Sequence, residues 1–127
     1  MVGIVVVSHS GEIASGTAEL AGQMAGPDVR IEAAGGDAVG GLGTDGDRVR
    51  AAIATADAGQ GVVVLGDLGS AILTVRAVLE GAENGHVALA DAPLVEGAVA
   101  AAVAASAGLE LPEVLRCAEE AKGATKL

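Results

Sequence analysis

The sequence predicts a three-layer α/β domain: a mainly parallel sheet with helices on both faces. Two valine-rich runs, residues 2–7 and 61–65, are typical of strands that are buried on both faces. Segments with helical spacing of apolar residues alternate with the strand segments along the chain. This alternation requires parallel strands joined by right-handed crossovers. No internal repeat or linker interrupts it, so we expect a single domain over residues 1–127.

The first half of the chain supplies two strands and two helices. Residues 2–7 form the first strand, and Gly26-Pro27 ends the helix that follows. That helix has apolar positions three or four residues apart: Ile13, Thr17, Leu20 and Met24. Apolar and charged residues alternate over 29–33, so the second strand should be half exposed. A glycine-rich loop over 34–46 then leads into a helix marked by Val49 to Ala56.

The second half repeats the alternation and adds a final helix. Residues 61–65 are the strongest candidate for a central strand. The next helix has one apolar face: Ile72, Val75, Val78 and Leu79. Residues 86–90 form a short fourth strand, which Asp91-Ala92-Pro93 interrupts. A helix over 95–103 and a last helix over 111–122 complete the chain, and Gly108 separates them.

Composition excludes several classes of partner. The chain has no Phe, Tyr or Trp, so its core must be aliphatic and it offers no stacking platform for nucleic-acid bases. A net charge of −10 repels phosphate backbones and anionic membranes, and no apolar run is long enough to cross a bilayer. The charge suits docking onto basic patches of partner proteins, or it simply favours solubility. The single cysteine, Cys117, fits packing in a reducing cytoplasm.

Polar residues follow all four predicted strands. Ligands of open parallel sheets bind outside the carboxyl ends of the strands, so these residues should collect on one rim. The four strand ends are Ser8-His9-Ser10-Gly11, Ala34-Gly35-Gly36-Asp37, Gly66-Asp67-Leu68-Gly69-Ser70 and Asp91-Ala92-Pro93.

His9 is the candidate nucleophile on this rim. A neutral imidazole attacks phosphoryl groups when one ring nitrogen is free and the other is held by a hydrogen bond. Asp67, at the end of the central strand, is the natural acceptor for that second N–H. Candidate phosphate-binding groups lie at two helix starts: Ser10, Gly11, Gly69 and Ser70. Alternatively, His9 merely ends a strand and Asp67 caps the next helix, although Ser70 is better placed as that cap.

Other motifs carry weaker signals. Residues 41–46 match G-x-G-x-x-G but do not follow the first strand, so we interpret them as a rim loop in which Thr44 and Asp45 cap the next helix. Contact of Thr44 with the phosphoryl group is a less favoured alternative. Glu96 either shapes a partner-docking surface or is the acidic first turn of a helix. His86 should lie at the opposite edge of the sheet, so we expect neither a metal site nor a cofactor.

Five segments in order resemble one family: Ile4–Ser10, Ala33–Gly36, Gly43-Thr44, Val62–Ala71 and Asp91–Ala98. Together they resemble the phosphotransfer subunit (DhaM type) of the phosphoenolpyruvate-dependent dihydroxyacetone kinase. The domain of that subunit is similar to the mannose-family EIIA domain of the bacterial sugar phosphotransferase system. The resemblance covers nearly the whole chain.

The resemblance implies a doubly wound fold, a homodimer and a phosphotransferase role. It places the phosphorylated histidine at His9 and its aspartate partner at Asp67. The implied route runs from phosphoenolpyruvate through enzyme I and HPr to His9, then to ADP on the DhaL subunit and to dihydroxyacetone on DhaK. A sugar-transport EIIA component that donates to an EIIB protein is the alternative, although the segments around Asp67 and Glu96 favour the first interpretation. A non-catalytic regulatory or ligand-binding α/β domain is a third possibility.

Overall fold

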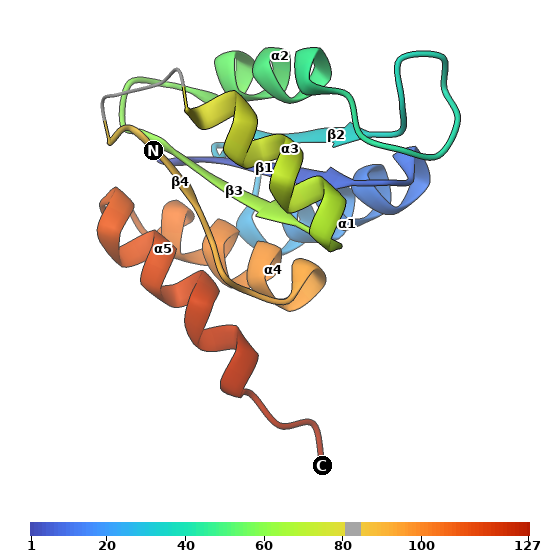
Figure 1. Ribbon diagram of the computed structural model, residues 1–127. Helices are drawn as coiled ribbons and strands as arrows, with labels where there is room; N and C mark the ends of the chain where they lie inside the picture. Colours follow the sequence, from blue (N-terminus) through green and yellow to red (C-terminus); the bar gives the residue numbers. More distant parts are fainter. Residues whose placement is uncertain (81–84) are drawn as a thin grey trace.

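The computed structural model describes residues 1–80 and 85–127, which form a parallel sheet between two layers of helices (Figure 1). The four strands described are β1 (Gly3–Ser8), β2 (Ile31–Gly35), β3 (Val62–Gly66) and β4 (Val87–Leu89). Their order across the sheet is β2-β1-β3-β4, and every pair is parallel. The predicted three-layer α/β fold is therefore confirmed.

The helices divide between the two faces of the sheet. Helices α1 (Gly11–Ala25), α4 (Leu94–Ser106) and α5 (Leu111–Glu120) cover one face, while α2 (Gly46–Ala56) and α3 (Gly69–Leu79) cover the other (Figure 1). A short 3₁₀ helix, η1 (Ala121–Gly123), follows α5. Within the described residues, no helix combines the length and the apolar character that a membrane span requires.

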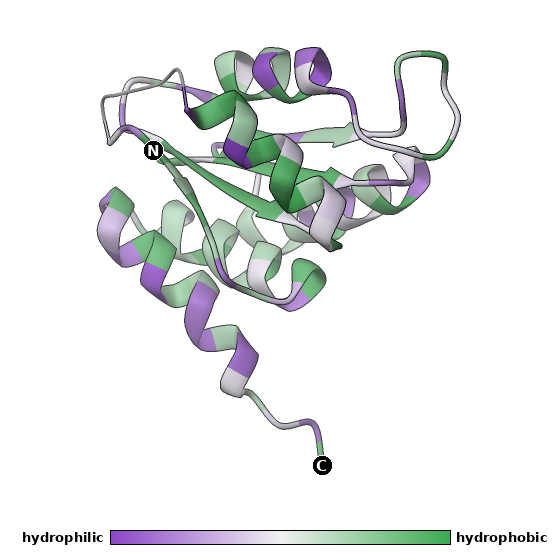
Figure 2. Cartoon of the chain, in the orientation of Figure 1, coloured by the Kyte–Doolittle hydropathy of each residue, from purple (hydrophilic) through white to green (hydrophobic). Residues whose placement is uncertain are grey.

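The side chains of the sheet pack into two aliphatic cores, one on each face, because they alternate along each strand. In β1, Ile4 and Val6 face the core beneath α1, α4 and α5, whereas Val5 and Val7 face the core beneath α2 and α3. All four side chains are fully buried, and each contributes about 1.5–3 kcal/mol of transfer free energy. Figure 2 shows the two central strands, β1 and β3, as mostly hydrophobic.

Of the four positions predicted for the inner face of the first helix, only Thr17 is buried. Ile13, Leu20 and Met24 are 51%, 42% and 60% exposed, while the buried residues of α1 are Ala14, Thr17 and Ala21. The inner face of α1 packs in the same core as the alanine-rich α4. Small side chains allow the two helix backbones to approach closely, so the larger residues lie outside.

Sheet register brings the candidate site together. Val7 of β1 pairs with Gly66 of β3, so the residues that follow these positions emerge side by side at the carboxyl edge of the sheet. The N–H of Asp67 donates to the carbonyl oxygen of Val7 at 3.2 Å, which continues the ladder by one residue. His9 and Asp67 are thus neighbours in space although they are 58 positions apart in the chain.

Candidate functional site

His9 is held by backbone contacts on two sides. Its own N–H donates to the Asp67 carboxylate at 3.2 Å, and its carbonyl oxygen accepts the N–H of Gly43 at 2.8 Å. The second bond comes from the loop between β2 and α2, which folds over the end of β1. The ring is therefore carried by a fixed backbone while its side chain stays 26% exposed.

The two ring nitrogens of His9 face different groups. Nδ1 lies 3.1 Å from Oδ1 of Asp67, and Nε2 contacts the hydroxyl of Ser70. An ionised carboxylate only accepts hydrogen bonds, so this geometry assigns the proton to Nδ1. Nε2 then keeps its lone pair and accepts the Ser70 hydroxyl proton. This arrangement leaves the outer nitrogen nucleophilic.

The Asp67 carboxylate accepts four hydrogen bonds from described residues. Oδ2 accepts the hydroxyl of Ser8 at 2.7 Å and the His9 N–H, while Oδ1 accepts His9 Nδ1–H and the N–H of Leu68 at 2.7 Å. Burial alone would raise the pKa of Asp67, but the donors from Ser8, His9 and Leu68 together hold that pKa below its ordinary value. The carboxylate is therefore ionised beside the ring.

The helix starts lie where the strand-end argument placed them. Gly11 and Gly69 are the first residues of α1 and α3, and first-turn N–H groups lack partners within their own helix. Ser10 is the N-cap of α1: its hydroxyl accepts the N–H of Ile13 at 3.3 Å, and its own N–H donates to Ser8 Oγ at 3.0 Å. Both Ser10 groups are thus already engaged within the protein.

The expected caps of α3 are not observed. Its N-cap residue is Leu68, which has no side-chain cap bond, and Ser70 lies inside the first turn with its hydroxyl toward His9. Asp67 bonds to Leu68 N–H and to His9 instead of capping the helix. Ser70 is the second residue of α3 and therefore lies past the N-cap position.

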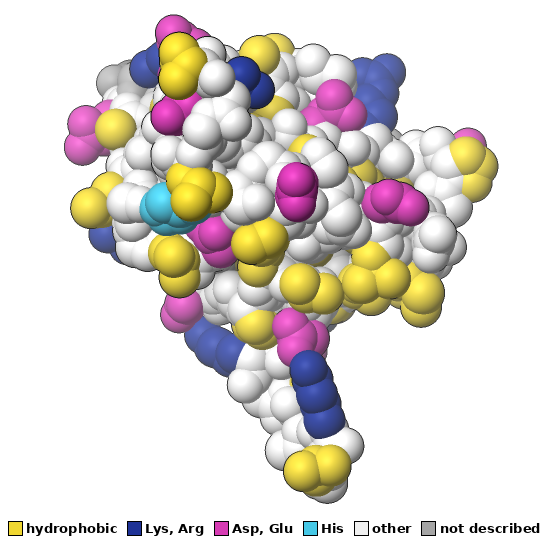
Figure 3. Space-filling model, turned by 90° about the vertical axis from the view of Figure 1, so that its right-hand side faces the viewer, with side chains coloured by type: hydrophobic (Ala, Val, Ile, Leu, Met, Phe, Trp, Pro, Cys, Tyr) yellow, Lys and Arg dark blue, Asp and Glu magenta, His cyan; other side chains and the backbone are white. Residues whose placement is uncertain are grey.

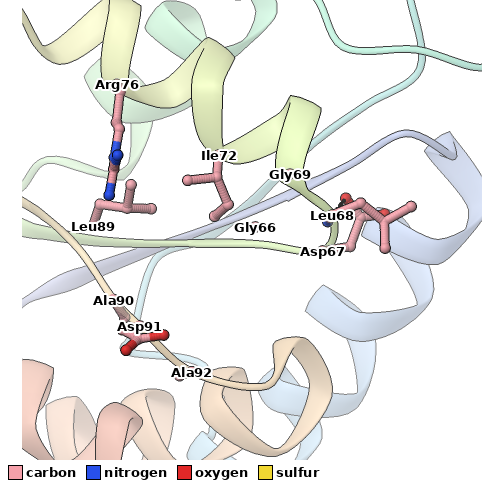
Figure 4. A pocket seen from close by; sticks show the side chains of 10 residues that line it. All are labelled: Gly66, Asp67, Leu68, Gly69, Ile72, Arg76, Leu89, Ala90, Asp91 and Ala92. Carbon is pink, nitrogen blue, oxygen red and sulfur yellow. Dashed lines mark hydrogen bonds between the residues drawn. The ribbon is translucent and has the colours of Figure 1, made fainter.

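Two hollows open beside these residues. One, of 370 Å³, lies between α3 and the segment after β4; its lining runs over residues 66–69 and 89–92 with Ile72 and Arg76 (Figure 4). The other, of 460 Å³, is lined by residues 10–12 and 40–42. Exposed leucines stand at both: Leu68 at the first and Leu42 at the second. Figure 3 shows hydrophobic side chains around a histidine on this face of the molecule.

The rim loop behaves partly as expected. Asp45 is the N-cap of α2 and accepts the N–H of Asp47 at 3.2 Å, as predicted. Thr44 is not a second cap: its hydroxyl oxygen is buried and bonds to no other described residue, while its backbone bridges to Gly36. Sequence reasoning also missed the bond from Gly43 to His9.

Ser8 is the functional-site residue that sequence reasoning missed most clearly. The sequence places Ser8 at the end of the first strand, and the structure shows it fully buried with its hydroxyl donating to Asp67. A signal was available, because a hydroxyl at a core position of a buried strand needs a hydrogen-bond partner.

Glu96 and His86 lie apart from the His9 cluster. Glu96 is in the first turn of α4, where Lys126 Nζ pairs with it at 2.9 Å and lowers the pKa of its carboxyl. His86 Nε2 bonds to Oδ1 of Asp57 at 3.0 Å, at the amino edge of the sheet. Over residues 1–80 and 85–127, no group of three His, Cys, Asp or Glu side chains is arranged to hold a metal ion.

Comparison with known proteins places this geometry in context. The family model EIIA-man, described as "PTS system fructose IIA component", matches residues 3–115. A Listeria innocua protein named "PEP-dependent dihydroxyacetone kinase 2, phosphoryl donor subunit DhaM" is 40% identical over 106 residues, which cover 81% of this chain and 85% of that protein. The DhaM subunit of Providencia stuartii is 40% identical over 95% of this chain, yet the chain spans only 27% of its length.

Solved structures agree with the fold. A protein described as of unknown function, EF1359, superposes with a TM-score of 0.83 at 34% identity, over 94% of this chain and 95% of that one. A sigma-54 interaction domain protein from Enterococcus faecalis superposes with a TM-score of 0.74 at 19% identity, over 96% of this chain and 90% of that one. The second likeness shows the shared fold alone.

Proposed function

This chain belongs to the EIIA-man family, and from that membership and the geometry around His9 we propose that it is a phosphohistidine carrier. His9 accepts a phosphoryl group from HPr and passes it to ADP on a DhaL subunit. DhaL then phosphorylates the dihydroxyacetone that is bound to DhaK. The relatives' names, phosphoryl donor subunits of a PEP-dependent dihydroxyacetone kinase, support this assignment. The observation that carries it is the Nδ1–Asp67 bond, which leaves Nε2 of His9 without a proton and facing the Ser70 hydroxyl.

The transfer step follows from this tautomer. The lone pair of Nε2 attacks the phosphorus of the donor's phosphohistidine, and an N–P bond forms as the donor's N–P bond breaks. The electron pair of the broken bond returns to the donor's imidazole. The proton on Nδ1 stays in place, and Asp67 stabilises the positive charge that the ring gains. In the onward step a β-phosphate oxygen of ADP attacks phosphorus, and Nε2 leaves with its electron pair.

The phosphoryl oxygens on Nε2 would meet donors from two helix starts. The N–H groups of Gly11 and Gly69 and the Ser70 hydroxyl are the candidates, and the positive ends of both helix dipoles favour negative charge there. We assign Ser10 a supporting role, because its groups already cap α1 and bond to Ser8.

The surroundings of His9 fit protein partners. The ring is partly exposed, and its neighbours Asp67 and Ser10 each line one of the two open hollows. Leu68 and Leu42, which line the same hollows, are 62% and 79% exposed. Apolar groups around a reactive atom, on a chain of net charge −10, suit a partner with an apolar patch and a basic rim. We further propose a cytoplasmic homodimer, on the family resemblance and the single cysteine.

A sugar-transport EIIA component that donates to an EIIB protein is the second candidate. The match to the EIIA-man model supports it, because that model is described by a sugar-system name. The DhaM names of relatives near 40% identity favour the dihydroxyacetone system.

The test is reconstitution. Incubation with phosphoenolpyruvate, enzyme I and HPr should add one phosphate to the chain, labile in acid and stable in base, and His9→Ala should abolish the gain. The phosphorylated chain should then lose the group to DhaL loaded with ADP and not to an EIIB protein. A gain that survives in His9→Ala would refute the carrier role. Transfer to EIIB alone would establish the second candidate.

A further inference from the structure

We propose that Ser8 is a positioning residue of the His9 site. Its buried hydroxyl holds the Asp67 carboxylate in the orientation that faces Nδ1 of His9, and it ties that carboxylate to the start of α1. The inference deepens the proposed function and rests on it, because it concerns how the His9 nucleophile is kept ready.

The direction of the hydrogen bonds around Ser8 is unambiguous. Ser10 N–H can only donate, and it lies 3.0 Å from Ser8 Oγ. The single hydroxyl proton of Ser8 is therefore available to Asp67 Oδ2 at 2.7 Å. A continuous chain of donors runs from the N-cap of α1 through Ser8 to Asp67.

Ser8 occupies a position that the strand pattern reserves for an apolar side chain. In β1 the side chains of Ile4 and Val6 point into the core beneath α1 and α4, and Ser8 continues this alternation while fully buried. A buried hydroxyl without a partner is costly, whereas a valine would suit the core. Serine at this position is therefore accounted for by Asp67 rather than by packing.

The restraint matters because the terminal torsion of an aspartate is soft. Rotation about χ2 has broad minima, so the orientation of the carboxylate depends on the hydrogen bonds that it accepts. Ser8 and the His9 N–H fix Oδ2, which leaves Oδ1 pointing at Nδ1 of the ring and at Leu68 N–H. Without Ser8, Oδ2 keeps only the longer 3.2 Å bond from His9 N–H.

The test compares Ser8→Ala with Ser8→Cys, whose thiol is slightly larger than the hydroxyl and is a weaker hydrogen-bond donor. Thr17→Val is the control, since it also removes a buried hydroxyl from the same core but lies on α1 outside the bonds of Asp67. We expect Ser8→Ala to slow phosphoryl transfer from HPr about 10-fold, Ser8→Cys to slow it less, and the control to match the parent chain.

Two spectroscopic readouts separate positioning from a merely structural role. In Ser8→Ala, the pKa of the Asp67 carboxyl, followed by carbon-13 NMR, should rise because one donor to the carboxylate is lost. Nitrogen-15 shifts of the His9 ring should show a mixture of tautomers in place of the single Nδ1–H form. Both are measured on the unphosphorylated chain, after circular dichroism has shown that the variant is folded.

The outcomes are distinguishable. If Ser8→Ala and Ser8→Cys transfer at the parent rate, or are slow with an unchanged carboxyl titration and ring tautomer, Ser8 is not a positioning residue. If Ser8→Ala does not fold, Ser8→Cys decides by the same readouts. If the parent chain gains no phosphate, the carrier function fails, while the titration and the ring shifts still decide whether Ser8 orients Asp67.

Discussion

Replacement of Asp67 by asparagine is the sharpest perturbation of the site. Asparagine keeps the shape of the side chain, so β3 and its ladder remain in place. The carboxylate of Asp67 accepts four hydrogen bonds from described residues, whereas an amide has a single acceptor oxygen and presents N–H groups at the other position. The amide N–H₂ would therefore confront protons from two of these donors.

The size of the effect follows from the bond that His9 loses. A hydrogen bond to a charged group contributes about 1.5–3 kcal/mol, and the Asp67 side chain is only 15% exposed, so solvent replaces little of it. At about 1.4 kcal/mol per tenfold in rate, this predicts phosphoryl transfer slower by about 10- to 150-fold. The amide N–H₂ also favours the imidazole tautomer that carries its proton on Nε2, and in that tautomer Nε2 has no lone pair for attack. We therefore expect the decrease in transfer rate to lie near the upper end of this range.

The assay is rapid-quench transfer from phosphorylated HPr, with the unfolding transition measured in parallel. The molecule supplies its own control, because Asp57 pairs with His86 at 3.0 Å, close to the 3.1 Å of the Asp67–His9 pair. Asp57→Asn breaks a comparable pair at the opposite edge of the sheet and should transfer at the parent rate. A folded Asp67→Asn variant within twofold of the parent would refute the role of Asp67. Equal slowing by Asp67→Asn and Asp57→Asn would show that the effect does not depend on the pairing of Asp67 with His9.

Three further predictions concern stability. Gly35→Ala places a Cβ 2.6 Å from Ser10 O and 2.8 Å from the Ala14 Cβ, so urea unfolding should show a free energy of unfolding lower by about 1–3 kcal/mol. Gly16→Ala meets open space in α1 and should raise the free energy of unfolding by about 0.5–1 kcal/mol. Equal effects of the two would contradict the close approach. Ser10→Ala removes the N-cap bond of α1 and should lower the free energy of unfolding by about 1 kcal/mol in the same assay. An unchanged free energy would show that this bond does not stabilise the helix. Because the folded pKa of Asp67 is depressed, its stabilising contribution is complete above the ordinary value of 3.8 and is lost as pH falls through the folded pKa. The stability difference between the parent and Asp67→Asn should therefore shrink in acid, and a constant difference down to about pH 2 would contradict this linkage.

The order of elements could be predicted because two valine runs are unambiguous. Residues 2–7 and 61–65 become β1 and β3, the two strands buried on both faces at the centre of the sheet. The phase of α1 could not be predicted in the same way. Pattern analysis assumes that the large residues face inward, but a core built with alanine reverses this, and Leu20 and Met24 lie outside.

The site was predictable where topology determines it and not where side-chain geometry does. His9 and Asp67 follow paired central strands, so their proximity follows from the strand order alone. The direction of Ser70 toward Nε2, the burial of the Thr44 hydroxyl and the bond from Ser8 to Asp67 depend on rotamers and loop paths. Neither spacing nor composition encodes those.

The two histidine–aspartate pairs show why place in the fold decides their chemistry. His9 stands at the carboxyl edge of the sheet, where α1 and α3 begin and their dipoles present positive charge. His86 stands at the amino edge, and its partner Asp57 is the C-cap of α2, where a helix dipole presents negative charge. A phosphoryl group would gain donors and favourable potential at the first pair and would meet carbonyl oxygens near the second. Similar distances between nitrogen and carboxylate therefore suit the proposed nucleophile at the carboxyl edge and not at the amino edge.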